Sequence, residues 1–182
     1  MYKIPLRHYL HGAFFMAIAV LFPQLFHLTG VGGTVILPMH IPVILAGFLV
    51  CPMIGLYVGI TAPIISHLIT GMPPVSPPIL PLMVVELGAY GFVAGLMYKI
   101  FRKNTYLSLT AAMVAGRTVL GAAAFIMMRF FGFNINPAVY VKGAVVTGLP
   151  GIVLQLVLIP VLVFMIERGT VHERSGNSNR RA

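Results

Sequence analysis

The sequence predicts an all-α membrane protein in which six transmembrane helices form one compact bundle. Hydrophobic residues make up 59% of the chain and charged residues only 8%, whereas charged residues make up about a quarter of a soluble domain. The mean hydropathy is +0.98, and long apolar runs recur along the 182 residues. The connections rich in Lys and Arg all fall on one side of the predicted membrane, which indicates an even number of spans.

Six apolar stretches mark the predicted spans, at about residues 9–28, 38–50, 53–70, 79–101, 107–131 and 137–166. The stretch at 38–50 is shorter than the ~20 residues that a helix needs to cross a bilayer. We expect it to be broken or to cross only partly, beside a cavity near the outer surface, because non-helical backbone at this depth needs cover. Residues 1–166 are predicted to form the membrane domain, and residues 167–182 a disordered cytoplasmic tail.

The distribution of basic residues predicts the orientation of the bundle. Lys99, Arg102 and Lys103 follow the fourth predicted span, and Arg168 and Arg174 follow the sixth. The opposite connections read TGVGGTVI, TGMPPVSPP and FGFNIN, and they hold no Lys or Arg. Under the positive-inside rule both termini are therefore cytoplasmic. This topology accounts for the formal net charge of +9, so we predict the lipid bilayer, and not nucleic acid, as the partner of the basic residues.

One acid and one base lie deep within the predicted spans. Glu86 is the only acid in any span; it lies ~10 Å below the outer end of its helix, and Arg117 lies ~15 Å from the inner end of its own. A charge at such depth costs ~2.5–3.5 kcal/mol on insertion scales and marks a functional candidate. A Glu86–Arg117 ion pair would hold both charges most cheaply. The sequence leaves open whether this pair is structural or contacts a ligand.

A second group of polar side chains lies nearer the predicted outer surface. His40 stands between Pro38 and Pro42, whose rings leave backbone carbonyls without helical partners. Arg129 is expected to snorkel to the outer headgroups, and snorkelling is also the alternative for Lys142. Tyr90 lies one turn inward of Glu86 on the same helix face. The outer group comprises His40, His67, Arg129, Asn134, Asn136 and Lys142.

Several function classes lack their motifs in this chain. It contains no Asp, no H-E-x-x-H zinc helix, no P-loop and no G-x-S-x-G turn. We therefore predict no enzyme, no metal site and no cofactor bound by this chain. Active transport would then draw its energy from a partner or from an ion gradient.

Small residues recur at a spacing of four in several spans. The stretches GLYVG and GFVAG each hold a glycine pair, and such faces let helices approach closely in lipid. We interpret the glycine pairs as internal packing. The stretch AFFMA places Ala13 and Ala17 one turn apart in the first span.

Taken together, these motifs resemble the substrate-binding S components of energy-coupling factor (ECF) transporters. The resemblance covers about residues 12–166 and rests on the order of AFFMA, LPMHIPVILAG, GMPPVSPP, ELGAYGFVAG, AGRTVLG and GLPGIVLQLVLIP. It implies a multi-pass subunit of the prokaryotic plasma membrane that binds a water-soluble vitamin or vitamin precursor. It also implies assembly with a membrane T component and two ATPase subunits, which are the subunits that use ATP.

The resemblance further implies roles for particular residues. Ala13 and Ala17 match the A-x-x-x-A motif with which the family contacts its T component.

Hydroxymethylpyrimidine is the nominal ligand, and a pyridoxine-type molecule, pantothenate or another micronutrient are the alternatives. A stand-alone secondary transporter or small channel with Glu86 as its coupling site is the alternative function. The predicted substrate contacts are His40, Glu86, Tyr90, Arg117, Asn134, Asn136 and Lys142.

Overall fold

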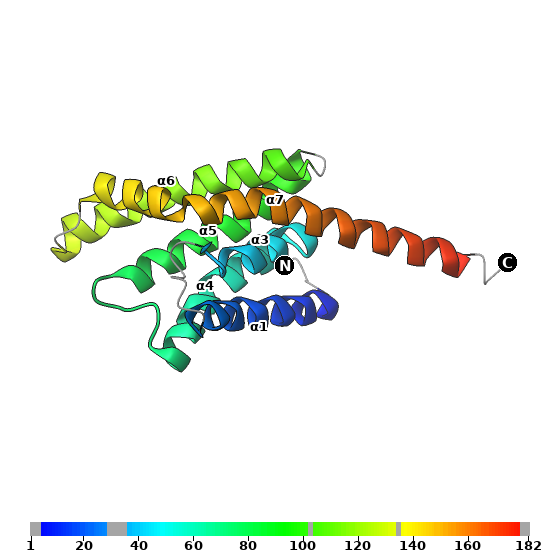
Figure 1. The fold of residues 1–182 in the computed structure, drawn as a ribbon, viewed down its shortest axis with the longest axis horizontal. Coiled ribbons are helices and arrows are strands. Elements are labelled where there is room, and N and C mark those ends of the chain that lie inside the picture. The colour runs from blue at the N-terminus through cyan, green and yellow to red at the C-terminus, as the bar shows by residue number, and fades with distance from the viewer. Residues whose placement is uncertain (1–4, 29–35, 102–103, 134–135, 179–182) are drawn as a thin grey trace.

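The computed structural model describes residues 5–28, 36–101, 104–133 and 136–178. Within these ranges the chain forms helices and no strand, so the predicted fold class is confirmed. Figure 1 shows the helices running roughly along one common axis. They are α1 (Leu6–Leu28), α3 (His40–Leu49), α4 (Pro52–Thr70), α5 (Ile79–Ile100), α6 (Thr105–Phe131) and α7 (Pro137–Ser178).

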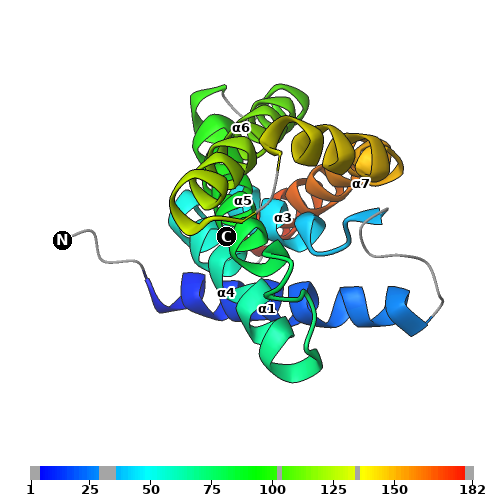
Figure 2. The ribbon, with the colours of Figure 1, turned by 90° about the vertical axis from the view of Figure 1, so that its left-hand side faces the viewer.

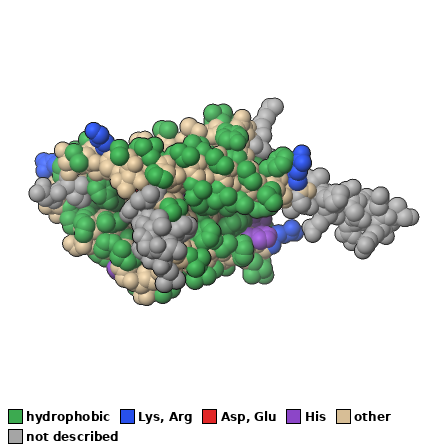
Figure 3. All heavy atoms as spheres, in the orientation of Figure 1, with side chains coloured by type: hydrophobic (Ala, Val, Ile, Leu, Met, Phe, Trp, Pro, Cys, Tyr) green, Lys and Arg blue, Asp and Glu red, His purple; other side chains and the backbone are tan. Residues whose placement is uncertain are grey.

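Five of these helices are long and apolar enough to cross a membrane, and α3, with ten residues, is not. The prediction of one incomplete span is therefore confirmed. Large hydrophobic side chains such as Phe14, Phe130 and Val153 are more than half exposed, which suits a surface that faces lipid rather than water. In the space-filling view (Figure 3), hydrophobic side chains are spread over much of the visible face, and the visible Lys and Arg lie toward the two ends of the described part of the molecule.

The two prolines around His40 mark the start of α3 rather than a break within a longer helix. Leu37 adopts a left-handed conformation with φ 53°, and the N–H of His40 donates to the Leu37 carbonyl at 3.1 Å. Pro42 falls in the first turn of α3, where its missing N–H would have had no helical partner in any case. The chain therefore enters α3 through a shaped turn, and the residues from His40 to Phe48 are all buried.

Glycines hold α3, α4 and α5 in direct backbone contact. A Cβ on Gly91 of α5 would collide with the Gly55 carbonyl of α4, and a Cβ on Gly47 of α3 would collide with the Gly91 carbonyl. A Cβ on Gly59 would meet the Leu87 carbonyl in the same way. This confirms that the glycine pairs serve internal packing. The end view in Figure 2 shows α3 near the centre of the bundle, and it contacts α1, α4, α5 and α7.

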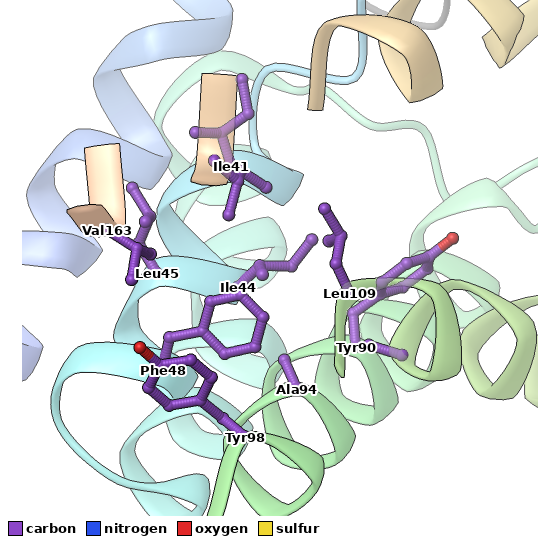
Figure 4. Close-up of a cluster of buried hydrophobic side chains, with 11 residues drawn as sticks. Ile41, Ile44, Leu45, Phe48, Tyr90, Ala94, Tyr98, Leu109 and Val163 are labelled. Carbon is purple, nitrogen blue, oxygen red and sulfur yellow. The ribbon is translucent and has the colours of Figure 1, made fainter. Parts of the chain in front are cut away.

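Apolar side chains fill the space between these helices. Figure 4 shows a cluster to which Ile44 and Phe48 of α3 and Tyr90 and Tyr98 of α5 contribute. The rings of Phe48 and Tyr98 lie 4.8 Å apart, and Leu109 of α6 is fully buried in the same cluster. This packing fixes the central helices against each other beneath the cavity described below.

The last helix is longer than the sequence analysis predicts. The sequence predicts a disordered tail over residues 167–182, whereas α7 continues as a helix of 42 residues to Ser178. Such a helix is ~63 Å long, about twice the hydrocarbon thickness of a bilayer, and Figure 1 shows it extending beyond the rest of the bundle. The guanidinium of Arg168 lies 4.2 Å from the centre of the Phe164 ring, a cation–π contact that favours helix across this boundary.

Candidate functional site

A cavity of about 600 Å³ lies at the end of the bundle where α3, α5 and α7 begin. This volume falls within the ~300–1,000 Å³ that is usual for small-molecule sites. Prolines and methionines, including Pro23, Met39 and Met83, make up much of its wall. The polar residues of the wall are His40, Ser66, Glu86, Arg117, Tyr140 and Thr147.

Glu86 and Arg117 form the predicted ion pair at the cavity wall. Arg117 Nη1 donates to Glu86 Oε1 at 2.7 Å, with relative exposures of 13% and 8% for the two side chains. The pair joins α5 to α6, and each charge offsets part of the desolvation penalty of the other inside the bundle. Because both residues also line the cavity, the pair is placed for a ligand role as well as for a structural one.

His40 is almost fully buried, at 2% exposure, and it also lines the cavity. Its ring meets the Tyr90 ring edge to face, with 5.0 Å between the ring centres and 80° between the planes. Neither Nδ1 nor Nε2 of His40 has a hydrogen-bond partner among the described residues. A buried polar group in this state costs ~1–3 kcal/mol, so the ring is available for an interaction that the protein alone does not supply.

Tyr90 lies behind His40 rather than on the cavity wall. It is 1% exposed, and its ring fits against Gly116 of α6, where a Cβ would collide with the ring carbons. The absence of a side chain at Gly116 therefore sets the position of Tyr90, and Tyr90 in turn supports the ring of His40. Tyr90 therefore packs behind the cavity wall and contacts the ring of His40.

Two of the remaining predicted contacts, Asn136 and Lys142, lie apart from the cavity wall. The side-chain oxygen of Asn136 accepts from the backbone N–H groups of Ala138 and Val139, at 3.1 and 3.3 Å, so it caps the start of α7. Lys142 is exposed and does not line the cavity. Asn134 lies outside the described residues. The structure thus brings together His40, Glu86 and Arg117, with Tyr90 directly behind them.

Two polar wall residues, Ser66 and Thr147, were not predicted from the sequence. Hydroxyl side chains are common in transmembrane helices, so composition alone does not single them out. A helical face offers the missing signal, because Tyr140, Ala144 and Thr147 follow the spacing of four and three that places side chains on one side of a helix. All three of these α7 residues line the cavity.

The proline-rich connection between α4 and α5 covers one side of the cavity. Its residues Met72, Pro73 and Pro74 line the wall. The connection is tied down at both ends, since His67 Nδ1 lies 2.9 Å from the Pro73 carbonyl and the N–H of Leu80 donates to the Pro74 carbonyl at 3.0 Å. The rigid prolines therefore form a shaped cover rather than a loose linker.

The fold and the cavity together define an α-helical membrane protein with a largely apolar cavity that carries a few polar side chains. The model of one family, described as ECF transporter, substrate-specific component, matches residues 12–163. The chain belongs to this family, which confirms the resemblance found in the sequence. Comparisons with curated proteins and with solved structures give no match.

Family membership establishes the general role of the chain. It is a membrane protein of transport and substrate binding, and the members of this family are transporter subunits rather than enzymes. The family also implies association with a T component and ATPases in a transporter complex.

Proposed function

We propose that this chain is the high-affinity substrate-binding subunit of an ATP-driven ECF importer for a water-soluble vitamin or vitamin precursor. The proposed ligand site is the cavity bounded by His40, Glu86 and Arg117. Hydroxymethylpyrimidine is the first compound to test, followed by pyridoxine and pantothenate. The chain itself binds no nucleotide in this proposal, and ATP is used by two partner ATPases.

The observation that carries the proposal is a set of polar nitrogens without protein partners at the wall of a cavity of vitamin size. Both ring nitrogens of His40, and Nε and Nη2 of Arg117, have no hydrogen-bond partner among the described residues. The cavity holds about 600 Å³, enough for a small polar ligand and several waters. A ligand that satisfies these nitrogens would gain affinity from groups that are costly to leave unpaired.

The charge distribution supports an orientation with the cavity toward the outer surface. Lys99 lies in the last turn of α5, at the end of the bundle opposite the cavity, and Arg168 lies far along α7 beyond the same end. Under the positive-inside rule this end is cytoplasmic. The cavity would then receive ligand from outside the cell.

The exposed face of α1 is the proposed contact with the T component. Ala13 and Ala17 are both exposed and lie one turn apart. Larger exposed side chains flank them along the same helix, including Leu10, Phe14 and Leu21. A face of small residues between large ones allows close approach of a partner helix within the membrane.

The proposal is tested with the chain alone and then with its partners. Purified protein should carry or bind a vitamin-type ligand, detected by mass spectrometry of co-purified molecules and by thermal shift against a panel that begins with hydroxymethylpyrimidine. Reconstituted uptake should require the T component, both ATPases and ATP. Uptake by the chain alone, without the ATPases or ATP, would instead support a stand-alone transporter with Glu86 as its coupling site.

A further inference from the structure

Arg117 has an unused edge. Of its guanidinium nitrogens, Nη1 donates to Glu86, whereas Nε and Nη2 have no hydrogen-bond partner among the described residues. The N–H groups of Nε and Nη2 lie on one edge of the planar group and point in nearly parallel directions. An edge of this kind matches the two oxygens of a carboxylate, which it binds through two parallel hydrogen bonds.

A glycine on α7 lies beside this edge, whose Nε and Nη2 atoms are buried from solvent. A Cβ on Gly148 would lie 3.5 Å from Arg117 Nη2 and 3.0 Å from Cδ1 of Leu37. Any longer side chain at position 148 would therefore compete for the space beside Nη2. Leu37 and the neighbouring Thr147 both line the cavity, so the free edge lies next to the cavity wall.

Glu86 determines how the edge is presented. Its single hydrogen bond to Nη1 holds the guanidinium in one orientation and leaves the opposite edge free. An uncharged ring nitrogen or hydroxyl would accept a hydrogen bond from one of the two N–H groups. The other N–H group would stay buried without a partner, at a cost of ~1–3 kcal/mol. A carboxylate would accept a hydrogen bond from each of the two N–H groups.

We infer that the substrate of this site carries a carboxylate, which pairs with the Nε and Nη2 edge of Arg117. The inference rests on the proposed function and narrows its ligand class to small polar acids. The bound carboxylate adds a negative charge near Glu86. The nitrogens of His40 have no partner among the described residues, so the N–H of its ring is available to donate a hydrogen bond to the carboxylate. The inference ranks an acid such as pantothenate above the neutral hydroxymethylpyrimidine.

The experiment compares acids with uncharged analogues of the same shape. Calorimetric titrations of the purified protein in nanodiscs use pantothenate against panthenol and nicotinate against nicotinamide, with hydroxymethylpyrimidine and pyridoxine as further probes. Mass spectrometry identifies any co-purified small molecule. We expect the tightest ligand to be an acid, bound at least about tenfold more tightly than its uncharged analogue.

Two variants test the role of the Arg117 edge. Arg117→Lys keeps the positive charge but lacks the pair of parallel N–H groups. The preference for the acid over its uncharged analogue should therefore fall by about tenfold. Gly148→Val places a side chain beside Nη2 without changing any charge. It should lower the affinity for the acid more than the affinity for its uncharged analogue. Val146→Ala, on the exposed side of the same helix, is the matched control. Circular dichroism and size exclusion verify folding, and Gly148→Val decides the matter if Arg117→Lys does not fold.

The outcomes separate this inference from the proposed function. If the tightest ligand has no carboxylate, the carboxylate inference alone is overturned. The same holds if both variants still prefer the acid over its uncharged analogue as strongly as the unchanged protein does. No binding by any probe and no co-purified small molecule would overturn the proposed function, and the inference with it. An acid preference that falls in Arg117→Lys or Gly148→Val but not in Val146→Ala would support the inference.

Discussion

Arg117 of α6 and Glu86 of α5 form an ion pair inside the bundle, with 2.7 Å between Nη1 and Oε1. The two side chains are only 13% and 8% exposed, so neither charge has full access to solvent. A lone charge at this depth would be costly, and the pair removes much of that penalty. The same contact orients Arg117 at the cavity wall, so one interaction contributes to stability and to the geometry of the site.

Removing the acid from this pair should destabilise the protein. Glu86→Gln leaves the Arg117 charge buried without its counter-ion, and breaking a buried pair in this way costs roughly 3 kcal/mol or more. Thermal unfolding in detergent should therefore show a clear fall in the midpoint. Replacing both charges, in Glu86→Gln with Arg117→Met, removes the orphaned ion and should recover much of the loss. A double variant less stable than Glu86→Gln would contradict this explanation.

Backbone contact between α4 and α5 predicts a sharp difference between two glycines of the same helix. Gly91→Ala would drive its methyl group into the Gly55 carbonyl, which belongs to backbone and cannot move alone. We expect a loss of about 1–3 kcal/mol in the free energy of unfolding. Gly88→Ala is the matched control, because its methyl group would meet Cγ1 of Ile60 at 3.0 Å, a side-chain atom that can shift. Equal losses of stability in the two variants would argue against close backbone contact between α4 and α5 as the cause.

The helices and the ion pair were open to prediction from the sequence for simple physical reasons. Apolar runs that end at Pro, Gly or Asn place the helix boundaries, and the start of α5 at Ile79 and the end of α6 at Phe131 agree with the prediction. Glu86 is the only acid in any predicted span, so Arg117 was the natural partner for it. Because an unpaired charge inside a membrane is costly, the two charges are expected to lie next to each other.

The side of each helix that lines the cavity was harder to predict from the sequence. In lipid both faces of a helix are apolar, so hydropathy does not show which face of α7 lines the cavity. Lys142 was therefore expected near the ligand although it is exposed, and Thr147 was overlooked although it lines the wall. Asn136 carries a local signal for its capping role, because an Asn directly before a Pro at the first helical position is typical of a helix N-cap.

His40 allows a test that separates binding from folding. His40→Phe keeps a ring against Tyr90 but removes two nitrogens that have no partner among the described residues. The free energy of unfolding of the ligand-free protein should stay level or rise by up to ~1–3 kcal/mol, because an unsatisfied polar group is lost. Ligand affinity, measured by calorimetry, should fall by about tenfold, which corresponds to one net hydrogen bond.

The control for His40 is its neighbour Ile41, which is 4% exposed and does not line the cavity. Ile41→Leu conserves volume and should change stability by less than ~1.5 kcal/mol, with ligand affinity unchanged. If His40→Phe lowers stability and leaves affinity intact, His40 has a structural role and the proposed ligand contact is wrong.

The exposed alanines of α1 predict an effect on assembly without an effect on the isolated chain. Ala13→Leu and Ala17→Leu add bulk to positions that are exposed in the structure, so the stability and ligand affinity of the chain alone should change by less than ~0.5 kcal/mol. A close helix contact with the T component would no longer fit, and the amount of T component recovered by co-purification should fall by about tenfold. Val153→Leu adds bulk to an exposed position on α7 and should leave assembly unchanged. Because lipid tolerates extra bulk on any exposed face, a loss confined to the α1 variants would identify that face as the partner contact, and equal recovery for all three variants would exclude it.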